Sequence, residues 1–178
     1  NIVHTYTITD NEDAPTIDFN SVSSTGAESV SSKDITVNLS GPSSETITVD
    51  YAVTGTASGS GDDYTLVNGT LIIDAGSTSG TITIANIIDD STDETDETVI
   101  VTLSSPSNAT LGSNDVHTYT IIDDDDAPVV EFNTTSSDDA ESVSSKEITV
   151  DLSAVSGQDV TVDYVVSGTA TGSGTDYT

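Results

Sequence analysis

The stretch ITVDYAV, residues 47–53, places Ile47, Val49, Tyr51 and Val53 at every second position. Successive side chains of a β-strand point to opposite faces, so this period of two predicts a strand with one buried face. Six further runs show the same period: Ile17 and Phe19; Ile35, Val37 and Leu39; Leu71 and Ile73; Ile82 and Ile84; Val99, Val101 and Leu103; and Tyr119 and Ile121. No segment has the period of a helix, and the sequence therefore predicts an all-β fold.

Turn residues separate these runs, among them Gly41-Pro42, Asn68-Gly69 and the glycine-rich stretch 55–61. Seven short strands within about 113 residues are typical of a two-sheet, immunoglobulin-like β-sandwich, which we predict here. A barrel with a similar number of strands is the alternative.

The chain repeats itself at an offset of 113 residues. HTYTITDNEDAP (4–15) returns as HTYTIIDDDDAP (117–128), and AESVSSKDITV (27–37) returns as AESVSSKEITV (140–150). At this offset 42 of the 65 overlapping positions are identical without a gap. Solenoid repeats are shorter, about 20 to 50 residues, so the period indicates sandwich domains in tandem. We expect an excerpt of a longer array: the last strand of a preceding repeat (1–13), a complete repeat (14–126) and the first half of a following repeat, the half-repeat (127–178).

Charge excludes several classes of partner. The chain has 31 Asp and Glu residues against two cationic residues, Lys33 and Lys146, for a formal net charge of -29. Binding to nucleic acid or to an anionic membrane surface requires clusters of Lys and Arg, so neither is expected. The chain has no Cys, hence no disulfide and no thiolate metal site. No apolar run reaches the roughly 18 residues of a membrane span, so direct membrane insertion is not expected.

Acidic residues are concentrated after two of the predicted strands. One cluster comprises Asp89, Asp90, Asp93, Glu94, Asp96 and Glu97, and Asp123–Asp126 form an unbroken run. Because antiparallel strands alternate in direction, both clusters should reach one pole of the sandwich, where we also expect Asp63 and Glu28. Two carboxylates about 4 Å apart repel by about 1 to 4 kcal/mol in water-like to surface-like surroundings. Oxygen ligands without Cys or His favour Ca²⁺, so a site for several calcium ions is predicted at the repeat junction.

The alternative interpretation of the acidic residues is a solvated, charged surface. We prefer that interpretation for scattered residues such as Asp18, Asp50, Asp74 and Asp115. For the two clusters we prefer metal binding, because a folded sandwich would bring them together.

The segments AESVSSKDITVNLS (27–40), TVDYAVTGTASGSGDDYT (48–65), 69–112 beginning GTLIIDAG, and HTYTIIDDDD (117–126) together resemble the Calx-beta domain. That family includes calcium-sensing domains of sodium/calcium exchangers and repeats of large bacterial surface proteins. The resemblance implies a seven-stranded immunoglobulin-like sandwich with Ca²⁺ at one pole. By motif position it implies the ligands Glu28, Asp63, Asp89, Asp90, Glu94, Glu97, Asp123, Asp124 and Asp125. Partial sets are Asp10 and Glu12 before the complete repeat, and Glu141 and Asp176 after it.

No catalytic constellation is identifiable, so we do not expect an enzyme. His4 and His117 occupy one repeat position, which leaves a single histidine per repeat, expected to be a packed or surface residue of the last strand. The function we predict is a calcium-binding structural repeat of an extracellular stalk or adhesin filament on a bacterial surface. Its partners would be neighbouring repeats and other copies in a filament.

Two other functions remain open. The alternative is a Ca²⁺-dependent module that recognises a carbohydrate or protein, although only 4% of the residues are aromatic and sugar binding usually needs an exposed aromatic platform. A calcium sensor is the third possibility, and the resemblance alone suggests it.

Overall fold

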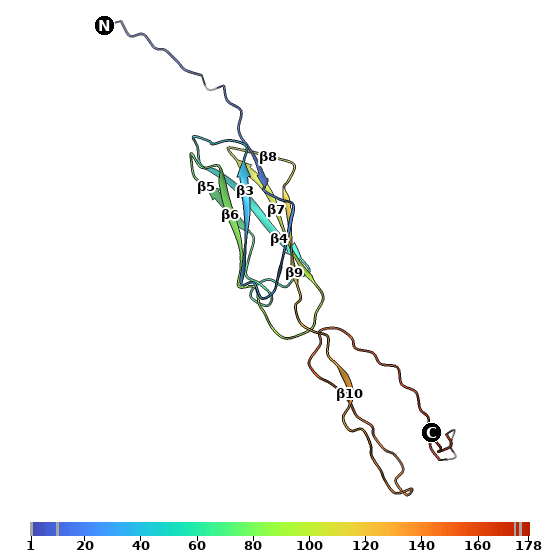
Figure 1. Ribbon diagram of the computed structural model, residues 1–178. Coiled ribbons are helices and arrows are strands. Elements are labelled where there is room, and N and C mark those ends of the chain that lie inside the picture. The colour runs from blue at the N-terminus through green and yellow to red at the C-terminus, as the bar shows by residue number, and fades with distance from the viewer. Residues whose placement is uncertain (1, 10, 173, 175) are drawn as a thin grey trace. The chain divides into compact units, whose positions relative to one another are not determined.

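The computed structural model describes residues 2–9, 11–172, 174 and 176–178, and all its regular elements are β-strands (Figure 1). None of these residues forms a helix with the length and hydropathy needed to cross a membrane. The chain divides into two units. Unit 1 comprises Asn1–Ser91 and Thr95–Asp124, and unit 2 comprises Thr92–Glu94 and Asp125–Thr178.

Unit 1 contains two sheets that pack face to face. In spatial order one sheet is β6-β3-β1-β8 and the other is β2-β9-β7-β4-β5. The strands are β1 (Thr16–Phe19), β2 (Ser23–Ala27), β3 (Ser32–Leu39), β4 (Ile47–Gly55), β5 (Gly69–Ile73), β6 (Ser79–Ala85), β7 (Glu97–Ser107), β8 (Thr110–Leu111) and β9 (Val116–Ile122). All seven predicted runs lie in strands, and the immunoglobulin-like sandwich is confirmed.

The alternating residues of both sheets form one core between them, which Ala57, Tyr64 and Ile87 from the connections complete. Its members are Ile17, Phe19, Ile35, Val37, Leu39, Ile47, Val49, Ala57, Tyr64, Ile73, Ile82, Ile84, Ile87, Val99, Val101, Leu103, Tyr119 and Ile121. Register keeps these residues on the inner face, as Ile35 pairs with Ile82 and Val99 with Tyr119. Where β4 ends, Gly55 has φ 140° and lies against the backbone of Thr98, a position that no side chain fits.

Two strands of unit 1 were not predicted. β2 has the sequence SSTGA, which offers no alternation of apolar and polar residues, and β8 is only two residues long. Both pair in parallel, β2 with β9 and β8 with β1. Tertiary contacts rather than local sequence preference therefore form these two edge strands.

His117 attaches the β2 segment to the sandwich. Its ring is 2% exposed and packs at 5.6 Å from the ring of Phe19. The Nδ1–H donates to the carbonyl oxygen of Ser21 at 2.6 Å, and Nε2 accepts from the Ser24 hydroxyl at 2.8 Å. His117 lies in the last strand as expected, and of the two placements expected there it has the packed one. Both ring nitrogens have a structural role.

Unit 2 contains the antiparallel pair β10 (Val130–Phe132) and β11 (Val150–Leu152). Val130 pairs with Leu152, which is the Ile17–Leu39 pairing of unit 1 moved by the 113-residue offset. Residues 160–168, equivalent to β4, form no strand here, and Tyr164 is 81% exposed. Within the described part of unit 2, no strand pairs with this segment, whereas β4 pairs with β5 and β7 in unit 1.

The segment 1–13 was expected to be a last strand like β9. The structure assigns no strand to residues 2–9 or 11–13, and Tyr6 and Ile8 are 80% and 84% exposed. In unit 1 the equivalent residues pair with β7 and β2, whereas no strand pairs with residues 2–9 or 11–13. The assignment of 1–13 to a preceding repeat stays a prediction, as do the repeat boundaries.

Replacing His117 tests its role in holding β2. His117→Ala removes a buried ring and leaves the Ser21 carbonyl without its donor, so we expect the free energy of unfolding to fall by about 2 to 4 kcal/mol. His4→Ala is the matched control, because His4 has the same sequence context and an exposed side chain. Urea unfolding followed by circular dichroism measures both. Equal stabilities of the two variants would contradict the assigned role.

Tyr119 provides a test at alkaline pH. Its ring is fully buried against Gly26, and burial raises the pKa of the phenol above its ordinary value of 10.0. The unfolded chain therefore loses this proton first as pH rises, so stability is retained below about pH 10 and falls above it. We expect Tyr119→Phe to reduce this alkaline loss in urea titrations between pH 8 and 11. Tyr6→Phe, at the equivalent exposed position, should behave as wild type, and an unchanged profile for Tyr119→Phe would contradict the interpretation.

Candidate metal centre

The parallel pairing of β2 with β9 builds one end of the sandwich. Ala27 lies opposite Ile122 in the register, so Glu28 and Asp123 are the next residues of two adjacent strands that run in one direction. The Glu28 amide donates to the carbonyl oxygen of Ile122 at 3.1 Å and extends the pairing by one step. Two carboxylates thus leave the sheet side by side.

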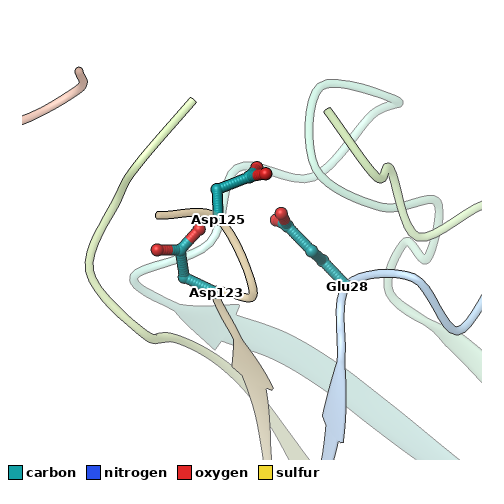
Figure 2. A group of neighbouring side chains, drawn as sticks. All are labelled: Glu28, Asp123 and Asp125. Carbon is teal, nitrogen blue, oxygen red and sulfur yellow. The ribbon is translucent and has the colours of Figure 1, made fainter. Parts of the chain in front are cut away.

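Five carboxylate side chains gather here in two overlapping groups. Glu28, Asp123 and Asp125 form one group, and their carboxyl groups converge in Figure 2. Glu28, Asp89 and Asp124 form the other, and in each group one oxygen per residue lies within 4.8 Å of the others. Glu28 belongs to both groups, and it is therefore the shared member of the cluster.

The two groups differ in burial. Glu28, Asp123 and Asp125 are half-buried, with one oxygen of each (Oε1, Oδ1 and Oδ2) almost inaccessible to solvent. Asp89 and Asp124 are exposed. The cluster is thus an enclosed set of oxygens with an outer, solvated side.

The connection after β6 positions Asp89. Thr65 and Ala85 form a two-way backbone bridge, and the Ile88 amide then donates to the carbonyl oxygen of Asp63 at 2.9 Å. Ile87 between them is buried in the core. Asp89 therefore follows a segment, residues 85–88, that is held by backbone hydrogen bonds and by the buried side chain of Ile87.

Asp63 has a structural task and contributes to neither group. Its Oδ2 accepts from the Ser58 amide, and its own amide donates to the Ser58 carbonyl at 3.0 Å. The same closure recurs in unit 2, where Asp176 accepts from the Thr171 amide at 2.6 Å. Next to Asp63, burial raises the pKa of Tyr64, and the Asp63 charge raises it further.

Asp90, Glu94 and Glu97, the remaining predicted ligands, also lie outside both groups within the described part of the chain. Two polar contacts of the cluster were not predicted. The Ser29 hydroxyl donates to Asp124 Oδ2 at 3.0 Å, and the Asp123 amide donates to Asp96 Oδ1 at 3.3 Å. Nothing in the sequence singles out Ser29 beyond its place next to Glu28. Asp96, in contrast, belongs to the acidic cluster that follows the predicted strand at Ile82 and Ile84.

Of the partial sets, the described residues Glu12, Glu141 and Asp176 belong to neither carboxylate group. Asp10 lies outside the described residues, and Glu12 is exposed. Glu141 is exposed in unit 2, and Asp176 closes its loop as described above.

The geometry of the five carboxylates suits a hard cation. Ca²⁺ binds oxygen at about 2.3–2.6 Å, so two oxygens on one ion lie at most about 5 Å apart. The oxygens of each group fall within that limit. The donor set is oxygen alone, without Cys or His, as calcium prefers.

The fold and this cluster define an immunoglobulin-like β-sandwich with a carboxylate-lined pole. A family model described as the Calx-beta domain matches residues 10–125 and again residues 123–178. The chain belongs to the Calx-beta domain family.

Relatives with known names support this assignment. The chain is 31% identical over 160 residues to sodium/calcium exchanger 1 of Rattus norvegicus, a match that covers 79% of this chain and 16% of the exchanger. The apo-form Calx CBD1 domain superposes with a TM-score of 0.57 at 29% identity, covering 64% of this chain and all of that domain. The calcium binding domain CBD12 of CALX1.1 gives 0.56 at 29% identity, covering 75% of this chain and 56% of that one.

Repulsion within the cluster is measurable without any ion. We expect Glu28→Gln to raise the free energy of unfolding by about 1 kcal/mol in chelator at low salt, because it removes the charge shared by both groups. The gain should shrink as salt screens the remaining carboxylates. Glu141→Gln, at the equivalent position in unit 2, should have no such effect. A loss of stability in Glu28→Gln under these conditions would argue against crowding of like charges.

Proposed function

We propose that the complete repeat binds Ca²⁺ through Glu28, Asp89, Asp123, Asp124 and Asp125, and that it serves as a structural unit of an extracellular stalk. The convergence of these five carboxylates at the strand ends carries the proposal. The match to the calcium binding domain CBD12 of CALX1.1 supports it.

Each residue has a distinct part in holding the ion. Glu28 is central because both groups share it, and Asp123 and Asp125 supply the enclosed oxygens. The hydrogen bond from the Ser29 hydroxyl orients Asp124. Asp89 lies at the end of the connection after β6, which the hydrogen bond from the Ile88 amide to the Asp63 carbonyl holds in place. A bound ion supplies positive charge that offsets the carboxylate repulsion. These ligands would then tie the ends of β2 and β9 to the segment after β6.

A role in a stalk is consistent with the sequence on both sides of the cluster. The half-repeat begins with Ala127 and Pro128 directly after the acidic run, and β10 already starts at Val130, so the connection is short and proline restricts its backbone further. Near-identity of the repeats suits a spacer better than a unique binding tip. Because the chain covers only 16% of the exchanger, the function and setting of the whole protein are part of this proposal.

The aromatic residues bear on the recognition alternative. The complete repeat has four Phe and Tyr side chains, namely Phe19, Tyr51, Tyr64 and Tyr119, and none is exposed. The complete repeat therefore presents no exposed aromatic side chain on which a sugar could stack.

A calcium-sensing role is a second candidate function, favoured by the similarity to sodium/calcium exchanger 1.

Thermal unfolding with and without Ca²⁺ tests the site. Binding to the folded state alone adds RT ln(1 + [L]/Kd), about 2.7 kcal/mol at a hundredfold excess over Kd. For a domain of this size we expect Ca²⁺ to raise Tm by roughly 10 °C, with a smaller effect of Mg²⁺. Glu28→Gln and Asp89→Asn should lose most of the shift.

Asp74→Asn is the control, because Asp74 is exposed and belongs to neither group. It should retain the full shift. Equal Tm values in Ca²⁺ and in chelator for the wild-type chain would refute calcium binding. Small-angle scattering of the same samples then addresses the stalk, because a stiffened array should give different profiles in the two conditions.

A further inference from the structure

The acidic connection after β6 also makes a contact through residues that belong to neither carboxylate group. Thr92–Glu94 lie in the complete repeat by sequence but belong to unit 2 in the structure. There they contact the turn Ser156–Gln158, which connects β11 to the β4-equivalent segment of the half-repeat. We propose that this turn is a recognition element for the acidic loop of the preceding repeat.

Three hydrogen bonds define the contact. The Gly157 amide donates to the carbonyl oxygen of Asp93 at 2.9 Å, and the Ser156 hydroxyl donates to Asp93 Oδ2 at 2.9 Å. The side-chain amide of Gln158 donates to the carbonyl oxygen of Glu94 at 3.2 Å. Asp93 and Ser156 also form a parallel backbone bridge. The turn thus contributes donors, and the acidic loop contributes acceptors.

Gly157 permits the close approach. A Cβ at this position would lie 2.9 Å from Glu94 Oε1 and 3.0 Å from Glu94 Cγ, both shorter than ordinary contacts. At the 113-residue offset the complete repeat has Ser44 instead. Its side chain would require the glutamate of such a loop to move away.

Gln158 supplies a donor that the complete repeat lacks. The equivalent residue is Glu45, and an ionised carboxylate only accepts hydrogen bonds. Over the four positions 156–159 and 43–46 the net charge is the same, because Asp159 stands where the complete repeat has Thr46. The difference is therefore one of hydrogen-bonding capacity, and Ser43 and Ser156 are the part that both turns retain.

These two positions distinguish the junctions of the array. The half-repeat turn, with Gly157 and Gln158, matches an acidic loop of the type Thr92–Glu94. The turn of the complete repeat, with Ser44 and Glu45, lacks both the space and the amide donor. Successive repeats with similar metal ligands would then differ in how firmly they hold the repeat before them.

Nuclear magnetic resonance of the full chain in chelator tests this directly. We expect a scalar coupling across the hydrogen bond between the Gly157 nitrogen and the Asp93 carbonyl carbon. Gln158→Glu should lower the protection of the Gly157 amide against hydrogen exchange by about two- to ten-fold, as the loss of one solvent-exposed hydrogen bond predicts. Ser156→Ala should act in the same direction while leaving residue 158 unchanged.

Glu45→Gln is the matched control and should leave Gly157 protection unchanged. Absence of the coupling in the wild-type chain, or full protection in both Gln158→Glu and Ser156→Ala, would overturn the proposal. So would a coupling that appears only after Ca²⁺ is added, because the contact is proposed to form without the ion. Failure of calcium binding, in contrast, would leave these expectations unchanged.

Discussion

The parallel pairing of β2 with β9 is the constraint on which the candidate centre depends. It sets Glu28 beside Asp123, and Glu28 is the residue common to both carboxylate groups. β2 has almost no apolar surface of its own, so its attachment relies on the backbone pairing with β9 and on the hydrogen bonds of His117 to Ser21 and Ser24. A buried histidine therefore helps to position an acidic side chain at the pole.

The fold was predictable where burial leaves a period in the sequence. β1, β3, β4 and β9 each bury alternate residues, and the runs identified them without tertiary information. β2 and β8 escaped prediction because parallel edge pairing demands no apolar face from SSTGA or from two residues. In the half-repeat the same period at 160–166 gave no strand, because a strand also requires neighbours.

The site was predictable as a location more than as a set of ligands. Alternating strand directions led to the expectation that the acidic segments after β6 and β9 share a pole, and Asp89 meets Asp124 there. The position of Asp63 in the motif does not reveal which hydrogen bonds its carboxylate makes. Its carboxylate accepts the Ser58 amide and closes its own loop, as Asp176 does with Thr171. A sequence states which residue is acidic, whereas the backbone decides where the carboxylate points.

Near-identical repeats separate the effect of sequence from the effect of surroundings. Phe19 and Phe132 occupy one repeat position, yet the first is buried beneath a second sheet and the second is exposed. Two segments identical at 42 of 65 positions can therefore contain the same strand residues and still differ in the burial of those residues. The positions at which the two segments differ are therefore the ones that can change which other segments they contact. Gly157 and Gln158, in place of Ser44 and Glu45, are such positions, because both donate hydrogen bonds to the acidic segment Asp93–Glu94. In the recognition that we propose, these two substitutions make chemically similar junctions unequal.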